Sequence, residues 1–439
     1  MEGKDARRVP LTYDVVVLGA GSAGCVLAAR LSENPDRRVC LVEAGPDYGP
    51  HSEGRWPAEI LDARRLALES HAWETAVEDR SQLRAKIVGG CSAHNACVVL
   101  RGADADYDEW GPGWTATELA PYLDRGEQEL RTRVFAEDEV SPWHRAFLEA
   151  RDEAIVHSVN AVGAVRWSTA FAYLDPARER RNLTIRADTL VDRIDPEAGA
   201  VTTDRGELAA ELIVLAAGAY GSPAILLRSG IGPGLEHDLP VGEGLSDHVG
   251  VGFGWETTEE LQREVDEFAK RAPVYMAQVT VRISDLFFFP GLDPGWEISA
   301  AVFAMKPWSR GRVSLLSADP AAPLSIDHGF LSDERDVIAL GEGVEQLRAI
   351  ATSEPVRRYA AREVRPGPEV SAAVHIRESV RGFFHPTGTC ALGRVVDAEA
   401  RLLGTPNVIV ADASIMPTIP TANTNLSTIA IAERIAERL

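Results

Sequence analysis

Two histidines in this sequence have neighbours that could put an imidazole to chemical use. The first, His385, lies in "FFHPTGTC" (383–390), where two aromatic residues precede it and Pro386 follows. A residue before proline favours extended backbone over helix, so we expect His385 in a loop. An imidazole buried beside aromatic rings resists protonation and stays available as a general base. This context predicts a proton acceptor at position 385.

The second histidine, His94, stands at the centre of "GGCSAHNAC" (89–97). Two glycines, small side chains and an asparagine are typical of a tight loop whose backbone comes close to another group. A neutral imidazole nitrogen in such a loop is a nucleophile. What the loop surrounds depends on the rest of the chain.

The elements that position these residues begin with "YDVVVLGAGSAGCVLAARLSENPDRRVCLVEAGP". The pattern predicts a strand over 15–18, a helix from 22 to about 31 and a second strand over 39–42. Such a βαβ unit places its strands in a parallel sheet.

The turn between this first strand and the helix carries GxGxxG. Its glycines permit a tight turn, close approach of a pyrophosphate to the backbone, and close packing of helix on strand. The pyrophosphate would lie on the helix N-terminus, and Glu43, 19 residues after Gly24, would accept hydrogen bonds from ribose hydroxyls. The motif alone does not separate FAD from NAD. The predicted dinucleotide contacts are Gly19, Gly21, Ser22, Ala23, Gly24 and Glu43.

The composition is that of a soluble globular enzyme with two or three domains, with 439 residues of which 45% are hydrophobic. A net charge of −21 argues against nucleic acid and anionic membranes as partners. The five cysteines are odd in number and show no metal-binding spacing, so we expect reduced thiols, no metal site and a cytoplasmic protein. The polar N-terminus lacks the apolar segment of a signal peptide.

Changes in pattern along the chain predict two interleaved domains. Patterns like those of the first unit return near residue 182 and at the C-terminus, whereas residues from about 246 to 380 show strand-like alternation with one acidic helix. The latter is typical of an antiparallel sheet with a helix on it. We expect an α/β fold in which a Rossmann-like dinucleotide-binding domain (1–145, 180–245 and 381–439) is interleaved with an α+β substrate-binding domain on an antiparallel sheet (146–179 and 246–380).

Four segments, in order, resemble the glucose-methanol-choline oxidoreductase family. They are "YDVVVLGAGSAG" with "LVEAGP"; "KIVGGCSAHNACVVLRGADADYDEW"; "GAYGSPAILLRSGIGP" followed by "LPVGEGLSDH"; and "HPTGTCALG" with "VADASIMPTIPTANTNLSTIAIAERIA". The resemblance covers almost the whole chain and implies FAD, so the first domain is expected to be a Rossmann-like FAD-binding domain. It also implies oxidation of a small-molecule alcohol to an aldehyde or ketone by hydride transfer to the flavin, with dioxygen or another electron acceptor.

In this family the loop with the two glycines resembles a cradle around the isoalloxazine and ribityl parts of FAD. Most members have an aliphatic residue at the position of His94, but choline-oxidase-like members have a histidine bonded to the 8α-methyl carbon of the flavin. The resemblance therefore implies a covalent link through His94, and the alternative is a loop histidine that only hydrogen-bonds nearby backbone. Ala96 departs from those members, which have Ser there. The implied contacts are Gly89, Gly90, Ser92, His94, Asn95 and Ala96.

The resemblance also implies a catalytic pair. His385 matches the active-site histidine of the family, and Asn423 matches its partner before the last helix. His385 would take the hydroxyl proton, and the pair would stabilise the charge that develops. Asn425 or a neighbouring residue is expected to cap the last helix, with Asn425 favoured, and His248 in "SDHVG" is expected to be structural. Further implied cofactor contacts are Val191, Asp412, Ala413, Asn423 and Thr424.

Two other functions share these motifs. A hydroxynitrile lyase that keeps FAD as a scaffold could use the same pair, and an FAD-binding protein without activity could retain the fold. A histidine-linked flavin favours redox work, and the intact pair argues against loss of activity. The chain is shorter than most family members in the substrate-binding half, so the sequence names no particular alcohol.

Overall fold

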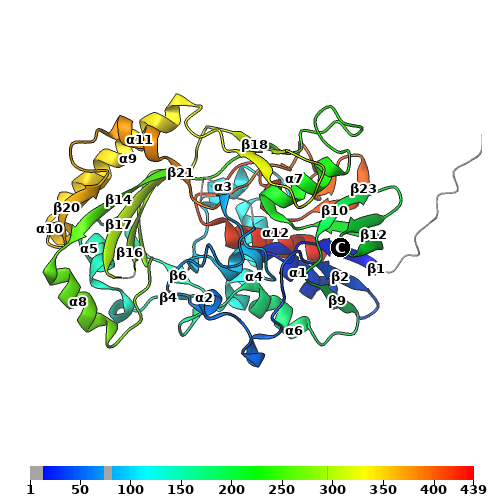
Figure 1. Ribbon diagram of the computed structural model, residues 1–439, viewed down its shortest axis with the longest axis horizontal. Coiled ribbons are helices and arrows are strands. Elements are labelled where there is room, and N and C mark those ends of the chain that lie inside the picture. Colours follow the sequence, from blue (N-terminus) through cyan, green and yellow to red (C-terminus); the bar gives the residue numbers. More distant parts are fainter. Residues whose placement is uncertain (1–12, 74–81, 294) are drawn as a thin grey trace, which may run out of the picture.

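The computed structural model describes residues 13–73, 82–293 and 295–439. Two large sheets lie toward opposite ends of its long axis, and the chain crosses between them several times (Figure 1). The predicted domain ranges 1–145 and 246–380 include residues 1–12, 74–81 and 294, which lie outside the described residues.

The first sheet has a parallel centre. In it β1 lies between β2 and β12, β9 pairs with β2, and β23 pairs with β12. Runs of valine, isoleucine and leucine bury these strands on both faces, as is typical of parallel sheets between helices. Antiparallel strands β10, β11 and β22 complete it. The bounds are β1 Tyr13–Leu18, β2 Val39–Val42, β9 Leu183–Arg186, β10 Val191–Asp195, β11 Ala200–Thr203, β12 Gly206–Leu215, β22 Arg401–Leu402 and β23 Thr405–Val410.

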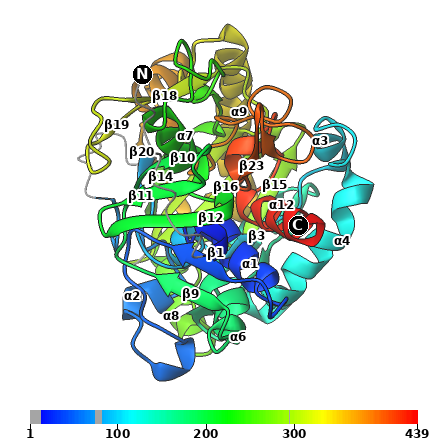
Figure 2. The ribbon, with the colours of Figure 1, turned by 90° about the vertical axis from the view of Figure 1, so that its right-hand side faces the viewer.

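The helices of this half pack on the first sheet and on one another. The last helix, α12, lies against both α1 and α4 (Figure 2). Its residues 426–435 are all buried, because helices enclose it on several sides. The predicted βαβ unit is confirmed, with the helix and the second strand at the expected bounds and the first strand two residues longer. The helices are α1 Ser22–Leu31, α3 Asp104–Asp108, α4 Ala116–Glu129, α6 Asp175–Ala177, α7 Gly218–Arg228 and α12 Thr424–Arg438.

The second sheet is antiparallel throughout, in the order β20-β14-β17-β16-β15-β5, with β21 also on β14. Helices α5 and α9 contact it. The strands are β5 Ala154–Val156, β14 Val249–Thr257, β15 Val279–Ile283, β16 Leu286–Asp293, β17 Glu297–Ala304, β20 Ala360–Arg365 and β21 Arg381–Gly382. The helices of this half are α5 Pro142–Ala150, α8 Glu259–Ala269, α9 Glu334–Thr352, α10 Glu354–Arg357 and α11 Ala372–Ser379.

Short elements lie between the longer ones along the chain. The smaller strands are β3 Val98–Val99, β4 Arg133–Val134, β6 Ser158–Val159, β7 Ala161–Val162, β8 Val165–Arg166, β13 Glu243–Leu245, β18 Gly311–Leu315 and β19 Leu324–Asp327. The remaining helical segments are α2 Ala58–Leu61, η1 His51–Glu53, η3 Gly90–Ala93, η4 Glu137–Glu139, the π-helix η5 Ala170–Leu174 and η6 Ala413–Ile415.

The predicted fold class is confirmed, since a Rossmann-like parallel unit is combined with an antiparallel sheet. The division into domains stays a prediction. One segment of the expected substrate-binding range, the π-helix η5, packs against α1 and within the core of the first half. Within the described residues, no helix combines the length and the apolar character needed to cross a membrane.

Candidate active site

The residues predicted to hold a dinucleotide gather at the carboxyl edge of the parallel strands. The glycine-rich turn follows β1, Glu43 follows β2, and Asp412 follows β23. Parallel strands end at the same edge of a sheet, so three loops from distant parts of the chain meet there. Asp412 ties the loop after β23 to the start of α7, which follows β12, because its Oδ2 accepts hydrogen bonds from the backbone N of Gly218 at 2.8 Å and from the Ser222 hydroxyl at 2.5 Å.

Glycines allow two close backbone contacts at this edge of the sheet. A Cβ on Gly24 would lie 1.8 Å from the carbonyl oxygen of Gly19, and a Cβ on Gly90 would lie 2.6 Å from the Cα of Gly21. The glycine-rich turn and the loop of residues 89–97, called the GG loop below, therefore stack directly on each other. Gly21 differs, since a Cβ there would meet only the Cα of Gly90 at 4.0 Å. Gly21 is also the N-cap of α1 and offers no side-chain cap to the first N–H groups of the helix.

These contacts predict opposite outcomes for two alanine substitutions. Gly24→Ala should destabilise the fold by more than about 4 kcal/mol, because strand and helix would have to separate. Gly21→Ala should leave the melting temperature within a few degrees of wild type, yet weaken cofactor binding at least about tenfold, because the methyl points to the side that a pyrophosphate would approach. Thermal melts of the apoprotein and flavin titrations measure both effects. Equal melting temperatures for the two variants would contradict this account.

Glu43 is buried at the end of β2. Its carboxylate accepts backbone hydrogen bonds from Ala20 and Gly45, each at 2.9 Å, which ties the end of β2 to the glycine-rich turn. Burial raises the pKa of Glu43 to about 7, against the lowering effect of these hydrogen bonds. The carboxyl group therefore lies beside the turn, where a ribose hydroxyl could reach it.

His94, in the middle of the GG loop, is buried. The ring is 2% exposed, and neither of its nitrogens has a hydrogen-bond partner among the described residues. Burial, together with the positive charges of Arg166 and Arg84, lowers the pKa of His94 to about 3, so the imidazole is neutral. The alternative of a histidine that hydrogen-bonds nearby backbone is therefore not what the structure shows.

The other polar side chains of this loop hold its shape. The Ser92 hydroxyl donates to the carbonyl oxygen of Gly89 at 2.6 Å and lies 2.8 Å from the hydroxyl of Thr169. Asn95 Oδ1 accepts from the backbone N of Cys97 at 2.9 Å. The loop thus satisfies its own polar groups and leaves the imidazole unpartnered.

His385 and Asn423 come together as predicted, although 38 residues separate them. Asn423 Nδ2 lies 3.3 Å from His385 Nε2. His385 lies three residues after β21, and Asn423 directly precedes α12, so the pair forms where the two halves of the molecule meet. The ring of His385 lies deep in the protein with part of its surface accessible. Burial, with the nearby His248 and the positive charge of Arg84, holds its pKa well below its usual value. Asn423 Oδ1 is buried without a partner among the described residues.

Comparisons with known proteins place this geometry in a family. Two GMC oxidoreductase models match residues 156–250 and 307–432, and a lycopene cyclase protein model matches residues 14–86 around the βαβ unit. A 5-(hydroxymethyl)furfural oxidase of Methylovorus sp. is 31% identical over 97% of this chain and 98% of the relative. An oxygen-dependent choline dehydrogenase of Chromohalobacter salexigens is 31% identical over 97% of this chain and 94% of the relative.

The chain belongs to the GMC oxidoreductase family. Among solved structures, pyridoxine 4-oxidase from Mesorbium loti matches this GMC oxidoreductase with a TM-score of 0.84 and 28% identity, over 97% of this chain and 99% of the other. The enzyme is therefore an FAD-dependent oxidoreductase that acts on CH–OH groups, as the resemblance implied. The comparisons do not support the hydroxynitrile-lyase alternative.

The residues of this GMC oxidoreductase fit FAD. The open side of Gly21, at the start of α1, suits a pyrophosphate, and Glu43 lies next to that turn. The unpartnered nitrogens of His94 and the unpartnered Asn423 Oδ1 are polar groups that a bound molecule could satisfy.

The remaining predicted contacts of the GMC oxidoreductase spread along the same half of the molecule. Val191 opens β10 and is buried, and Ala413 begins η6 next to Asp412. Thr424 is the first residue of α12 and is buried. The prediction for Asn425 is wrong: it lies inside α12, where its Oδ1 accepts a hydrogen bond of 2.6 Å from the Ser22 hydroxyl, so it joins α12 to α1 instead of capping the helix.

Sequence reasoning missed one neighbour of the catalytic pair. His248 was expected to be only structural, but its Nδ1 lies 2.9 Å from His385 Nδ1 and its ring is buried. An isolated bridge between Ser246 and Thr387 brings the two segments together. The signal was present in the sequence, because "SDH" belongs to one of the family-like segments.

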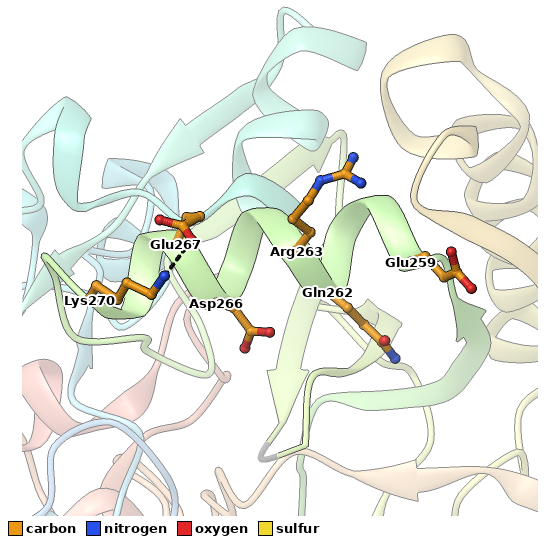
Figure 3. Close-up of a pocket in the computed structure, with 6 residues that line it drawn as sticks. All are labelled: Glu259, Gln262, Arg263, Asp266, Glu267 and Lys270. Carbon is orange, nitrogen blue, oxygen red and sulfur yellow. Dashed lines mark hydrogen bonds and ion pairs between the residues drawn. The ribbon is translucent and has the colours of Figure 1, made fainter.

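A separate surface feature lies away from this site. A shallow hollow of about 570 Å³ follows the polar side of α8, on the second half of the GMC oxidoreductase (Figure 3). An ion pair between Lys270 and Glu267 crosses it. Its side chains are long and solvated, so we assign it no part in the chemistry. The lining residues are Glu259, Gln262, Arg263, Asp266, Glu267 and Lys270.

Proposed function

We propose that this enzyme oxidises a neutral primary alcohol whose hydroxymethyl group is attached to a ring, with His385 as the general base. The observation that carries this proposal is a continuous aromatic cluster that ends at the base. The ring of Phe383 lies 4.7 Å from that of His385 and stacks on Phe303 at 4.0 Å with an interplanar angle of 15°. Phe289 adds a third ring, 4.8 Å from Phe383.

Strand alternation builds this cluster. On β16 the side chains of Phe287 and Phe289 belong to it, whereas Phe288 between them points into the core on the opposite face. On β17 the same alternation places Phe303 in the cluster. One face of the antiparallel sheet therefore packs against its helices, and the other presents aromatic rings toward His385.

The charges around the cluster favour a neutral alcohol over a cationic one. The guanidinium of Arg282 lies 5.1 Å from the ring centre of Phe287. The positive charge of Arg84 also acts on His385, where it helps to lower the pKa. The carboxyl of Asp247 also lies beside His385, but burial raises its pKa to about 7, so below that pH it offsets little of this positive charge. A quaternary ammonium substrate such as choline is therefore disfavoured, although choline dehydrogenases are among the relatives.

The names of two relatives agree with this substrate class. A 5-(hydroxymethyl)furfural oxidase and a pyridoxine 4-oxidase are both named for alcohols that carry the hydroxyl on a ring-attached carbon. Aromatic side chains recognise flat rings through edge and face contacts.

The chain's own residues supply the proton chemistry. His385 Nε2 takes the hydroxyl proton, and Asn423 Oδ1 and Nδ2 orient the substrate oxygen beside it. Bound FAD supplies the acceptor for the hydride. The resulting imidazolium and the Asn423 amide stabilise the negative charge on oxygen, and the aromatic rings exclude water, which strengthens these interactions. The electrons pass on to dioxygen or another acceptor.

The same proposal assigns FAD to the first half of the molecule. FAD would be held by residues from 1–145, 180–245 and 381–439, and the substrate by residues from 146–179 and 246–380. The cofactor would be lined by the glycine-rich turn, Glu43, the GG loop, Val191, Asp412, Ala413 and Asn423 with Thr424. All five cysteines are free thiols in the structure, which supports a cytoplasmic location.

An anaerobic screen tests the substrate class. Benzyl alcohol and 5-(hydroxymethyl)furfural should reduce the flavin with kcat/KM at least about tenfold above that of choline or an unbranched aliphatic alcohol. The readout is bleaching of the flavin absorbance in a stopped-flow cuvette. A preference for choline would refute the proposed substrate, and the absence of bleaching with every alcohol would refute the proposed function.

Phe383→Leu tests the cluster itself. It should lower kcat/KM for ring alcohols about 3- to 10-fold relative to an aliphatic alcohol, because one aromatic contact is lost. The matched control is Phe288→Leu on the opposite face of the sheet, which should leave the ratio between substrates unchanged. Equal changes of the ratio in both variants would show that the effect is general loosening of the sheet.

A further inference from the structure

We propose that His248 is a positioning residue that fixes the tautomer of His385, through a relay that runs from the Pro420 carbonyl across both imidazoles to Asn423. This inference rests on the proposed role of His385 as the base. It concerns a residue that the catalytic pair itself does not include.

The contacts form one unbroken chain. The carbonyl oxygen of Pro420 lies 2.9 Å from His248 Nε2, and His248 Nδ1 lies 2.9 Å from His385 Nδ1. His385 Nε2 then lies 3.3 Å from Asn423 Nδ2. The two imidazole rings are nearly perpendicular, at 87°, with their centres 5.1 Å apart. All of these distances allow hydrogen bonds.

The direction of each hydrogen bond follows from the first acceptor. A carbonyl oxygen can only accept, so His248 carries its proton on Nε2. Burial lowers the pKa of His248 to about 4, which keeps the ring neutral with a lone pair on Nδ1. That lone pair accepts from His385 Nδ1–H, and His385 must then expose its own lone pair on Nε2. This is the nitrogen that faces Asn423 and takes the substrate proton.

The backbone supports the same arrangement. Asp247, the neighbour of His248, accepts hydrogen bonds at Oδ1 from the backbone N of Phe383 at 3.2 Å and of His385 at 3.0 Å. Phe384 between them has a φ of 64°, a left-handed conformation that turns both N–H groups toward one oxygen. A bulky residue adopts this conformation only where the surroundings hold it. The Asp247–His248 segment thus fixes both the loop and the ring of His385.

The consequence appears during proton transfer. When His385 takes a proton at Nε2, its ring becomes a cation whose Nδ1–H still donates to His248. A hydrogen bond to a charged group is stronger than one to a neutral group, so the relay stabilises the protonated base more than the resting base. Without an acceptor at Nδ1, His385 could place its proton on Nε2 and lose the lone pair that the reaction needs.

The experiment compares three variants of the FAD-bound enzyme. His248→Leu removes the acceptor and should slow anaerobic flavin reduction about 10- to 100-fold, with little change in the KM of the alcohol. His248→Asn carries an amide oxygen at the position of Nδ1 and should restore the rate to within about fivefold of wild type. His248→Gln reaches only the position of Nε2, so it should keep the Pro420 contact and remain as slow as His248→Leu.

NMR spectroscopy of the unaltered enzyme tests the same relay independently of these rates. In histidine labelled with ¹⁵N, His385 should appear as the Nδ1–H tautomer and His248 as the Nε2–H tautomer, assigned with single-site variants. An Nε2–H tautomer for His385, or equal rates for His248→Asn and His248→Leu, would overturn the relay. If His385→Ala is slow but His248→Leu reduces at the wild-type rate, only this inference fails. If His385→Ala also reduces at the wild-type rate, the proposed function itself fails.

Discussion

His385→Ala should slow the reduction of bound flavin by a ring alcohol roughly 10²- to 10⁴-fold, which is the usual effect of losing a general base. The substitution removes the nitrogen that faces Asn423 but no contact of the glycine-rich turn, so the protein should remain yellow with stoichiometric FAD. Anaerobic stopped-flow measurements separate this step from reoxidation. Reduction at the wild-type rate would show that another group takes the proton.

The pH dependence of the unaltered enzyme is a second test of His385 as the general base. Only the neutral imidazole accepts a proton, and burial holds the pKa of His385 well below 6.5. kcat/KM should therefore decrease only at pH values well below 6.5, and it should stay level from there to neutral pH. An acid limb at or above pH 6.5 would indicate a solvent-exposed base. His237→Ala, which alters an exposed histidine, should change neither the rate nor the pH profile.

The first half of the fold was predictable because local sequence determines it. Strand residues 15–18 and 39–42 are uninterrupted apolar runs. The glycines between strand and helix are expected where the backbone leaves no room for a side chain, and the structure shows such a close contact at Gly24. The pairing of His385 with Asn423 was predictable only through the family resemblance. Nothing in the local pattern says that residues 38 positions apart will lie 3.3 Å from each other.

The features that were missed depend on how distant segments pair. His248 reaches His385 because Ser246 and Thr387 form an isolated β-bridge. A sequence pattern does not predict which residues will pair in such a bridge. The alternation along β16 predicts that Phe287 and Phe289 share a face, but which face looks toward the base depends on the placement of the whole sheet. Asn425 looked like a cap because asparagine favours helix starts, whereas contact between α1 and α12 decides its partner.

The GG loop provides the last prediction, a covalent bond between His94 and the flavin. Burying two imidazole nitrogens without partners costs about 1–3 kcal/mol for each, so the loop maintains an arrangement that hydrogen bonding within the protein does not explain. With a pKa lowered to about 3, His94 is neutral throughout the ordinary pH range and keeps a lone pair for bond formation. Gly90 stacks on Gly21, so the GG loop that carries His94 lies against the turn expected to hold the cofactor.

Acid precipitation of the purified enzyme should leave the yellow colour in the pellet, and His94→Ala should release all of it to the supernatant while the folded variant still binds FAD. Forming the bond releases two protons and two electrons, and the electrons pass to the enzyme's electron acceptor. His71→Ala alters another histidine near His94 and should keep the link, which separates loss of the bond from a general change of charge.

Because an electron-withdrawing substituent makes a flavin a stronger oxidant, His94→Ala should also lower the flavin reduction potential. If the unaltered enzyme releases its flavin in acid, the unpartnered imidazole lies beside the cofactor without a bond, and the likeness to choline-oxidase-like members ends at the shape of the loop.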